Sequence, residues 1–119
     1  MAKLIVKDMH SPEETRKFGK GKVDLANFEG KTIGLATFEP GWRWSKDVKP
    51  MVKTDWCEAP HFQYQVSGTL HVKMADGDER DIKAGEVAWI PPGHDGWVVG
   101  NEPVVAVDFQ GMSAYAKKI

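Results

Sequence analysis

Six short segments of strand-forming composition follow one another through the second half of the chain. Short strands at such regular spacing, separated by glycine- and proline-containing turns, are typical of an antiparallel sandwich or barrel. The turns are marked by Ser67-Gly68, Asp76-Gly77-Asp78, Ala84-Gly85, Pro91-Pro92-Gly93 and Asn101-Glu102-Pro103. We therefore expect an all-β fold, with strands at residues 60–67, 69–74, 80–83, 86–90, 97–99 and 104–109.

The first half of the chain has more varied signals. Residues 23–28 and 32–38 are typical of two strands joined in a hairpin, and residues 3–7 of a short first strand. Ser11, followed by Pro12 and two glutamates, predicts a short N-terminal helix that ends by Gly19, so this strand and helix would occupy residues 1–21. Residues 40–54 are expected to form a long loop, and residues 113–118 a short helix.

Size and charge bound the class of protein. A chain of 119 residues predicts a single domain over residues 1–119. Sixteen Lys and Arg balance 17 Asp and Glu without a basic cluster, so we expect neither a nucleic-acid partner nor an anionic membrane. One cysteine excludes an internal disulfide and favours a cytoplasmic location. No apolar run approaches the roughly 20 residues of a membrane span.

A group of potential metal ligands surrounds the start of the first of the six segments. Asp55 and Cys57 are two residues apart, and His61 is four residues further on. On an extended backbone all three side chains would therefore point to the same side. Six residues separate His61 from Gly68, which lies at the first turn.

A second stretch has an equally regular spacing. Gly85 is followed by five residues, the turn Pro91-Pro92-Gly93, two residues, Gly96, three residues and Gly100. Together the two spacings resemble the two motifs of the cupin superfamily. The first family motif is His-x-His, then three residues, Glu, six residues and Gly. The second is Gly, then five residues, Pro-x-Gly, two residues, His, three residues and Asn. The wider sequence is similar to small single-domain cupins. The resemblance implies a double-stranded β-helix, the cupin jelly-roll barrel, with the motifs within residues 32–109.

The residues at the family's ligand positions differ from the family pattern. Asp55 and Cys57 stand where the family has histidines, and His61 stands where it has glutamate. Gly96 replaces the last ligand histidine, and Gly100 replaces the asparagine.

Placed on the family framework, Cys57, His61 and His94 form a candidate metal site. His94 lies two residues before the family's histidine position and would approach the same cavity from the Pro-Pro-Gly turn. Asp55 would be the fourth ligand or would orient a histidine. The thiolate favours zinc, with iron, nickel and manganese left open. The alternative is that Cys57 is a small packing residue.

The strand over residues 60–67 has two different faces. Gln63 and Gln65 share the parity of His61, so both are expected to line a wet, polar cavity with it. Phe62, Tyr64 and Val66 would face the opposite way. That apolar face needs its own cover, and we expect a second copy of the chain to supply it in a homodimer.

The residues Arg43 and Trp44, next to Trp42, are candidates for a substrate pocket. Arginine would present a bidentate donor to a carboxylate substrate, under a lid of tryptophan. The alternative is that the tryptophans pin the loop to the rim of the barrel.

Two functions are compatible with these features. In the first, a metal polarises a small oxygenated or acidic substrate, as in isomerases, lyases or oxygenases. In the second, the protein is a metal-free module that binds a small molecule in a polar barrel. A dimeric structural subunit with a filled barrel is a third possibility.

Overall fold

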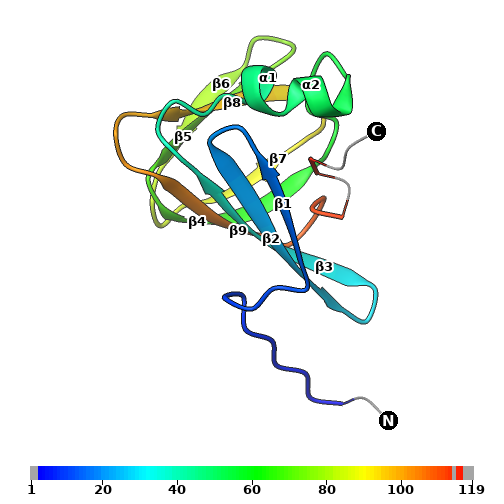
Figure 1. Ribbon diagram of the computed structural model, residues 1–119. Helices are drawn as coiled ribbons and strands as arrows, with labels where there is room; N and C mark the ends of the chain where they lie inside the picture. The colour runs from blue at the N-terminus through cyan, green and yellow to red at the C-terminus, as the bar shows by residue number, and fades with distance from the viewer. Residues whose placement is uncertain (1–2, 114, 117–119) are drawn as a thin grey trace.

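The computed structural model describes residues 3–113 and 115–116, which form two antiparallel β-sheets (Figure 1). The larger sheet has the strand order β1-β2-β3-β9-β4-β7, and the smaller sheet has the order β6-β5-β8. This arrangement confirms the all-β fold class and is consistent with a jelly-roll sandwich. The strands are β1 Glu14–Phe18, β2 Gly21–Phe28, β3 Lys31–Phe38, β4 His61–Ser67, β5 Thr69–Met74, β6 Glu79–Ile82, β7 Val87–Ile90, β8 His94–Val99 and β9 Val104–Asp108.

The glycine and proline turns lie where the sequence predicted them. All six segments predicted in the second half form strands, β4 to β9. The predicted hairpin is also present, because β2 and β3 pair in register up to Phe28 and Lys31. Its turn residues Glu29 and Gly30 have φ angles of 48° and 86°, the left-handed conformation that two-residue hairpin turns use.

The prediction of an N-terminal helix is wrong. The segment forms β1, which pairs with β2 along its whole length, and the Thr15 hydroxyl donates a hydrogen bond to the Asp24 carboxylate at 2.7 Å. The N–H of Ser11 donates to the Asp8 carbonyl in a turn, and residues 3–7 have no regular structure. A helix of about two turns is marginal by itself, so pairing with β2 outweighs the capping signal.

Two short helices interrupt the long loop that was predicted over residues 40–54. They are α1 Trp44–Asp47 and α2 Lys49–Val52, and the Asp47 carboxylate accepts a hydrogen bond from the N–H of Arg43 at 3.0 Å. Trp42, Trp44 and Val48 are buried, so this connection contributes to the core. None of the helices that the structure describes is long and apolar enough to cross a bilayer.

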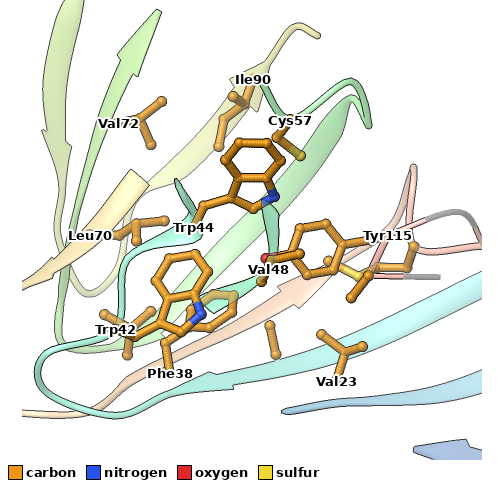
Figure 2. Packing of buried hydrophobic residues seen from close by; sticks show 14 of the residues in the cluster. Val23, Phe38, Trp42, Trp44, Val48, Cys57, Leu70, Val72, Ile90 and Tyr115 are labelled. Atoms are coloured by element: carbon orange, nitrogen blue, oxygen red, sulfur yellow. The ribbon is translucent and has the colours of Figure 1, made fainter. Parts of the chain in front are cut away.

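The core between the sheets is rich in aromatic side chains (Figure 2). Phe38 and Trp42 stack with ring centroids 4.0 Å apart. Phe18 meets Tyr115 edge-on, with centroids 6.2 Å apart. Offset and edge-on pairs of this kind add to the stabilisation from burial alone.

The segment after β9 folds back onto the core. Arg16 donates hydrogen bonds to the carbonyl oxygens of Met112, Ser113 and Tyr115, at 3.1, 3.2 and 2.8 Å. Tyr115 is buried and lies in a turn. Of the helix predicted over residues 113–118, residues 114 and 117–118 lie outside the described residues, and the described part is turn.

Gly68 lies in the turn between β4 and β5 and packs against Pro103, in the turn before β9. Substitution of this glycine tests that packing. Its φ is 74°, and a Cβ atom there would lie 2.4 Å from the Pro103 carbonyl oxygen. Gly100 is a matched control, because its φ is 80° and a Cβ there would meet nothing within 4 Å. We expect Gly100→Ala to lower the free energy of unfolding by about 1 kcal/mol, and Gly68→Ala by about 3 kcal/mol. Denaturant titration measures both; equal losses would contradict the steric explanation.

Candidate metal centre and adjoining cavity

Three potential metal ligands meet between the two sheets. Cys57 precedes β4, His61 begins β4 and His94 begins β8. All three are buried, and their candidate ligand atoms lie within 4.8 Å of one another. The Cys57 Sγ is 3.8 Å from the His61 Nε2. The structure therefore brings together the three residues that the sequence grouped.

Backbone hydrogen bonds hold Cys57 beside the Pro-Pro-Gly turn. The N–H of Cys57 donates to the His94 carbonyl at 2.8 Å, and the N–H of Gly93 donates to the Cys57 carbonyl at 2.8 Å. His61 enters from the larger sheet, where it pairs with Ile90 of β7. Because these contacts are between main chains, the positions of Cys57 and His94 depend little on their side chains.

Both imidazole rings are oriented by hydrogen bonds at Nδ1. His61 Nδ1 lies 2.5 Å from Asp108 Oδ2, and His94 Nδ1 lies 2.8 Å from the Pro91 carbonyl oxygen. With Nδ1–H donating in each case, Nε2 is left available on both rings. Metal-bound histidines usually have this arrangement, with a carboxylate or a carbonyl holding the other nitrogen.

The donor set and its spacing fit a zinc-like ion. Zinc binds sulfur at about 2.3 Å and nitrogen at about 2.0–2.1 Å, so tetrahedral ligand atoms are roughly 3.3–3.6 Å apart. The observed separation of 3.8 Å between Cys57 and His61 is close to this value, and the upper limit of 4.8 Å needs a side-chain shift of roughly 1 Å. Three protein ligands leave one position open, as catalytic zinc sites do.

Burial shifts the pKa values of Cys57 and His94 in opposite directions. It raises the pKa of the Cys57 thiol to about 12, and the nearby carboxylates of Glu58 and Asp108 act in the same direction. It lowers the pKa of His94 to about 4, with a further contribution from His61. His94 is therefore a neutral ligand at pH 7, whereas Cys57 would lose its proton on binding a cation.

A small cavity of about 30 Å³ adjoins the cluster. His61, Gln63 and His94 line it, and no aspartate, glutamate, lysine or arginine is among the described lining residues. Most of the wall is apolar and aromatic, including Phe38, Trp42, Trp44 and Tyr115 (Figure 2). The expectation of a wet, polar cavity is therefore not met, because the connection at residues 40–52 and the segment after β9 cover the polar face of β4.

The four residues that were predicted to line a substrate pocket lie at different places relative to the cavity. Gln63 and Trp44 line the cavity. Gln65 is fully buried beside it, where its amide donates to the carbonyl oxygens of Ser67 and Gly68 at 3.3 Å each. Arg43 is exposed on the outside of the protein, so it does not reach a substrate in this cavity.

Asp55 lies outside the cluster. We expected it to be a fourth ligand or to orient a histidine, but it is exposed and Asp108 accepts the hydrogen bond of His61 instead. The parity argument required an extended backbone from residue 55, whereas residues 55–56 form a bend and β4 begins only at His61.

Sequence reasoning missed two further residues of the site. Asp108 is completely buried at the end of β9, and Tyr115 packs edge-on against His61 with ring centroids 5.2 Å apart. Burial raises the pKa of the Tyr115 phenol well above its ordinary value. The signal for Asp108 was present, because a carboxylate that ends an apolar strand needs a hydrogen-bond partner. No pattern in the sequence marked Tyr115.

A second group of interacting polar side chains, centred on His71, lies on the outer face of the smaller sheet. His71 Nδ1 is 2.6 Å from Asp81 and His71 Nε2 is 2.7 Å from Glu79. The His71 ring stacks on Trp97. The Arg43 guanidinium also lies over the Trp97 indole, 4.0 Å from the ring centroid. This cluster is separate from the cavity.

The contacts of His71 predict a pH dependence of stability. Burial lowers the pKa of His71, but the hydrogen bonds to Asp81 and Glu79 outweigh it and raise the pKa above 6.5. A raised pKa in the folded state means that the contact stabilises fully below the unfolded pKa of about 6.5 and is lost as pH rises through the folded pKa. The unfolding free energy of wild type should therefore exceed that of His71→Gln by a larger margin at about pH 5.5 than at about pH 8.5. A difference that does not change with pH would contradict this.

Comparison with known proteins identifies the fold through solved structures. The chain matches no protein-family profile and no curated protein. A cupin-like protein from Thermotoga maritima superposes with a TM-score of 0.59 at 18% identity, covering 95% of this chain and 89% of that one. A protein of unknown function from Rhizobium leguminosarum superposes with a TM-score of 0.57 at 20% identity, covering 92% and 97%.

An enzyme is also among the similar structures. Oxalate decarboxylase from Bacillus subtilis superposes with a TM-score of 0.57 at 28% identity and covers 83% of this chain. The chain spans only 27% of the length of that enzyme. A related structure of the same enzyme concerns its Mn(II) centres.

Proposed function

The protein has a cupin-type fold, and on this premise we propose that it binds a divalent transition metal, zinc, through Cys57, His61 and His94. The bound ion would act on a small, uncharged, oxygenated substrate in the adjoining cavity. One observation carries the proposal: both imidazoles are held at Nδ1, by Asp108 and by the Pro91 carbonyl, which leaves Nε2 of each ring as the candidate ligand atom, with the His61 Nε2 3.8 Å from the Cys57 sulfur.

The choice of zinc follows from the ligand types. A thiolate with two imidazoles is softer than the oxygen-rich sites that manganese prefers. The manganese of the Bacillus subtilis oxalate decarboxylase therefore does not transfer directly to this chain. Nickel and iron accept imidazole as well, so the metal content is the first property to measure.

The cavity favours an uncharged substrate over an acidic one. Its described lining has no lysine or arginine to balance a carboxylate, and Arg43 lies outside. The buried indole N–H of Trp42 has no hydrogen-bond partner among the described residues, so it can donate to a ligand oxygen. The amide of Gln63 offers a further polar group. A volume of about 30 Å³ limits the ligand to a few heavy atoms unless the walls move.

In such a reaction the chain's own residues have distinct roles. A bound divalent cation would supply Lewis-acid polarisation of a substrate oxygen. Asp108 and the Pro91 carbonyl hold the two rings in place. Trp42, Trp44 and Tyr115 supply an aromatic wall beside the substrate. The Tyr115 phenol stays protonated because burial raises its pKa, so it remains a hydrogen-bond donor.

A metal-free binding module is the second candidate. The high pKa of the Cys57 thiol favours it, because a protonated thiol in an aromatic pocket is a weak ligand. In that case Trp42 and Gln63 would recognise a small neutral molecule without chemistry.

Elemental analysis of protein purified without an affinity tag separates the two candidates. The metal proposal expects about one zinc per chain, lost in His61→Ala, and a melting temperature that falls in the presence of a chelator. Protein that is free of metal, does not take up added zinc and melts unchanged in chelator would refute it and support the binding module.

A further inference from the structure

A groove runs along one open side of the sandwich, between the edge strands β6 and β7. Its volume is about 380 Å³. Val72, Ile82 and Ile90 contribute apolar surface to it. The acidic residues Asp78, Glu79, Asp81 and Glu86 line it as well, against the single basic residue Arg80, so the groove is negatively charged.

Beside this groove lies an exposed apolar face of the larger sheet, formed by the outward side chains of β4 and β7. Phe62 and Trp89 form an edge-on pair with ring centroids 6.4 Å apart and are 46% and 56% exposed. Tyr64 and Val87, the next pair in the register, are 44% and 63% exposed. β7 is also the last strand of its sheet, so its outer backbone groups have no strand partner among the described residues. Such an edge is a template for another extended chain.

The chain contains an extended segment that fits this edge. We call residues 3–7 the arm; it leaves the two sheets and extends away from them (Figure 1). Leu4 and Val6 are 94% and 84% exposed. The arm also carries Lys3, whereas Lys7 at its base is held within its own chain by Glu13 at 2.7 Å and by the Asn27 carbonyl.

We propose that the protein forms a symmetric homodimer in which the arm of each copy pairs with the open edge of β7 in the other. Side chains alternate along a strand, so Leu4 and Val6 would lie on the apolar face while Lys3 and Ile5 point toward the acidic groove. The occupant is a second copy because Lys3 of the arm is complementary in charge to the acidic groove, and Leu4 and Val6 are complementary to the apolar face. Within one chain the arm leads into β1, at the opposite edge of the larger sheet from β7. Two equivalent contacts close the assembly at two chains.

The mass of the protein in solution tests the dimer. We expect wild type at micromolar concentration to sediment with twice the chain mass of 13.3 kDa. The double substitution Leu4→Asp with Val6→Asp should raise the dimer dissociation constant by about 100-fold or more, since two apolar contacts become charged. Val99→Asp is the matched control, because Val99 is 41% exposed on β8, at the edge of the smaller sheet away from β6. The zinc content of both variants should equal that of wild type.

Cross-linking tests where the arm binds. In the double variant Leu4→Cys with Val87→Cys, mild oxidation should join two chains covalently, whereas Leu4→Cys with Val99→Cys should not. The native Cys57 is buried and does not compete. Three results would overturn the proposal: a monomeric wild type, a dimer that the arm substitutions leave intact, or a disulfide between the new cysteines within one chain, which would mean that the arm covers its own groove.

Discussion

Cys57→Ala and His94→Ala are each expected to lower the zinc affinity by about 100-fold or more. Structural zinc sites gain about 10–16 kcal/mol from four ligands, so one ligand contributes about 3–4 kcal/mol. That energy corresponds to an affinity change of about 100- to 1000-fold. Competition against a chromogenic chelator measures the loss. His10→Ala is the control, because the His10 side chain is 92% exposed and its Nδ1 contacts Asp8 at 3.1 Å.

Cobalt provides an independent readout of the same site. Cobalt that replaces zinc should show a thiolate charge-transfer band in wild type and in His10→Ala. The band should be absent in Cys57→Ala, since Cys57 is the chain's single cysteine. If cobalt binds stoichiometrically to wild type without that band, Cys57 is a packing residue and the ligand set is wrong.

Asp108→Ala is expected to destabilise the fold by about 3 kcal/mol. One carboxylate oxygen accepts from His61, and the other accepts from the N–H groups of Phe62 and Gln110 at 3.1 and 3.0 Å. The side chain is completely buried, and each buried donor left without a partner costs about 1–3 kcal/mol. Denaturant titration of the metal-free protein measures this loss separately from zinc binding.

Asp108→Asn separates the structural role from the orienting role. The amide oxygen can still accept from the N–H of Phe62, so most of the stability should be kept. The amide nitrogen would then face His61 Nδ1, and the ring would have to place its proton on Nε2 to accept from it. Zinc affinity should therefore fall by about 10- to 100-fold. Wild-type affinity in Asp108→Asn would show that Asp108 does not orient His61.

Most of the β-structure was predictable because its signals are local. Glycine and proline determine where the backbone can turn, so the positions of β4 to β9 follow from the sequence, although β8 begins at His94, three residues earlier than expected. The N-terminal helix was mispredicted although Ser11 and Pro12 are good capping residues. Whether residues 14–18 find a strand partner depends on β2, and pairing at that distance is not visible in local propensity.

In the candidate site, too, the residues predicted from the sequence are those marked by short-range spacing, and the residues that were missed are distant in sequence. His61 and Cys57 are four residues apart, and the motif spacing placed His94 near them. Asp108 is 47 residues from His61, and Tyr115 reaches the cavity through the segment after β9. The side-chain type of Arg43 suggested a carboxylate substrate, but its guanidinium stacks on Trp97 outside the sandwich.

The hydrogen bonds of Arg16 hold one part of the cavity wall in place. This side chain holds the three carbonyl groups of the turn that carries Met112 and Tyr115, and both of those side chains form part of the cavity wall. A guest of more than a few atoms fits only if that turn moves outward and gives up those bonds. The fit of a larger molecule would therefore depend on Arg16 of β1, a residue that is not part of the described cavity wall.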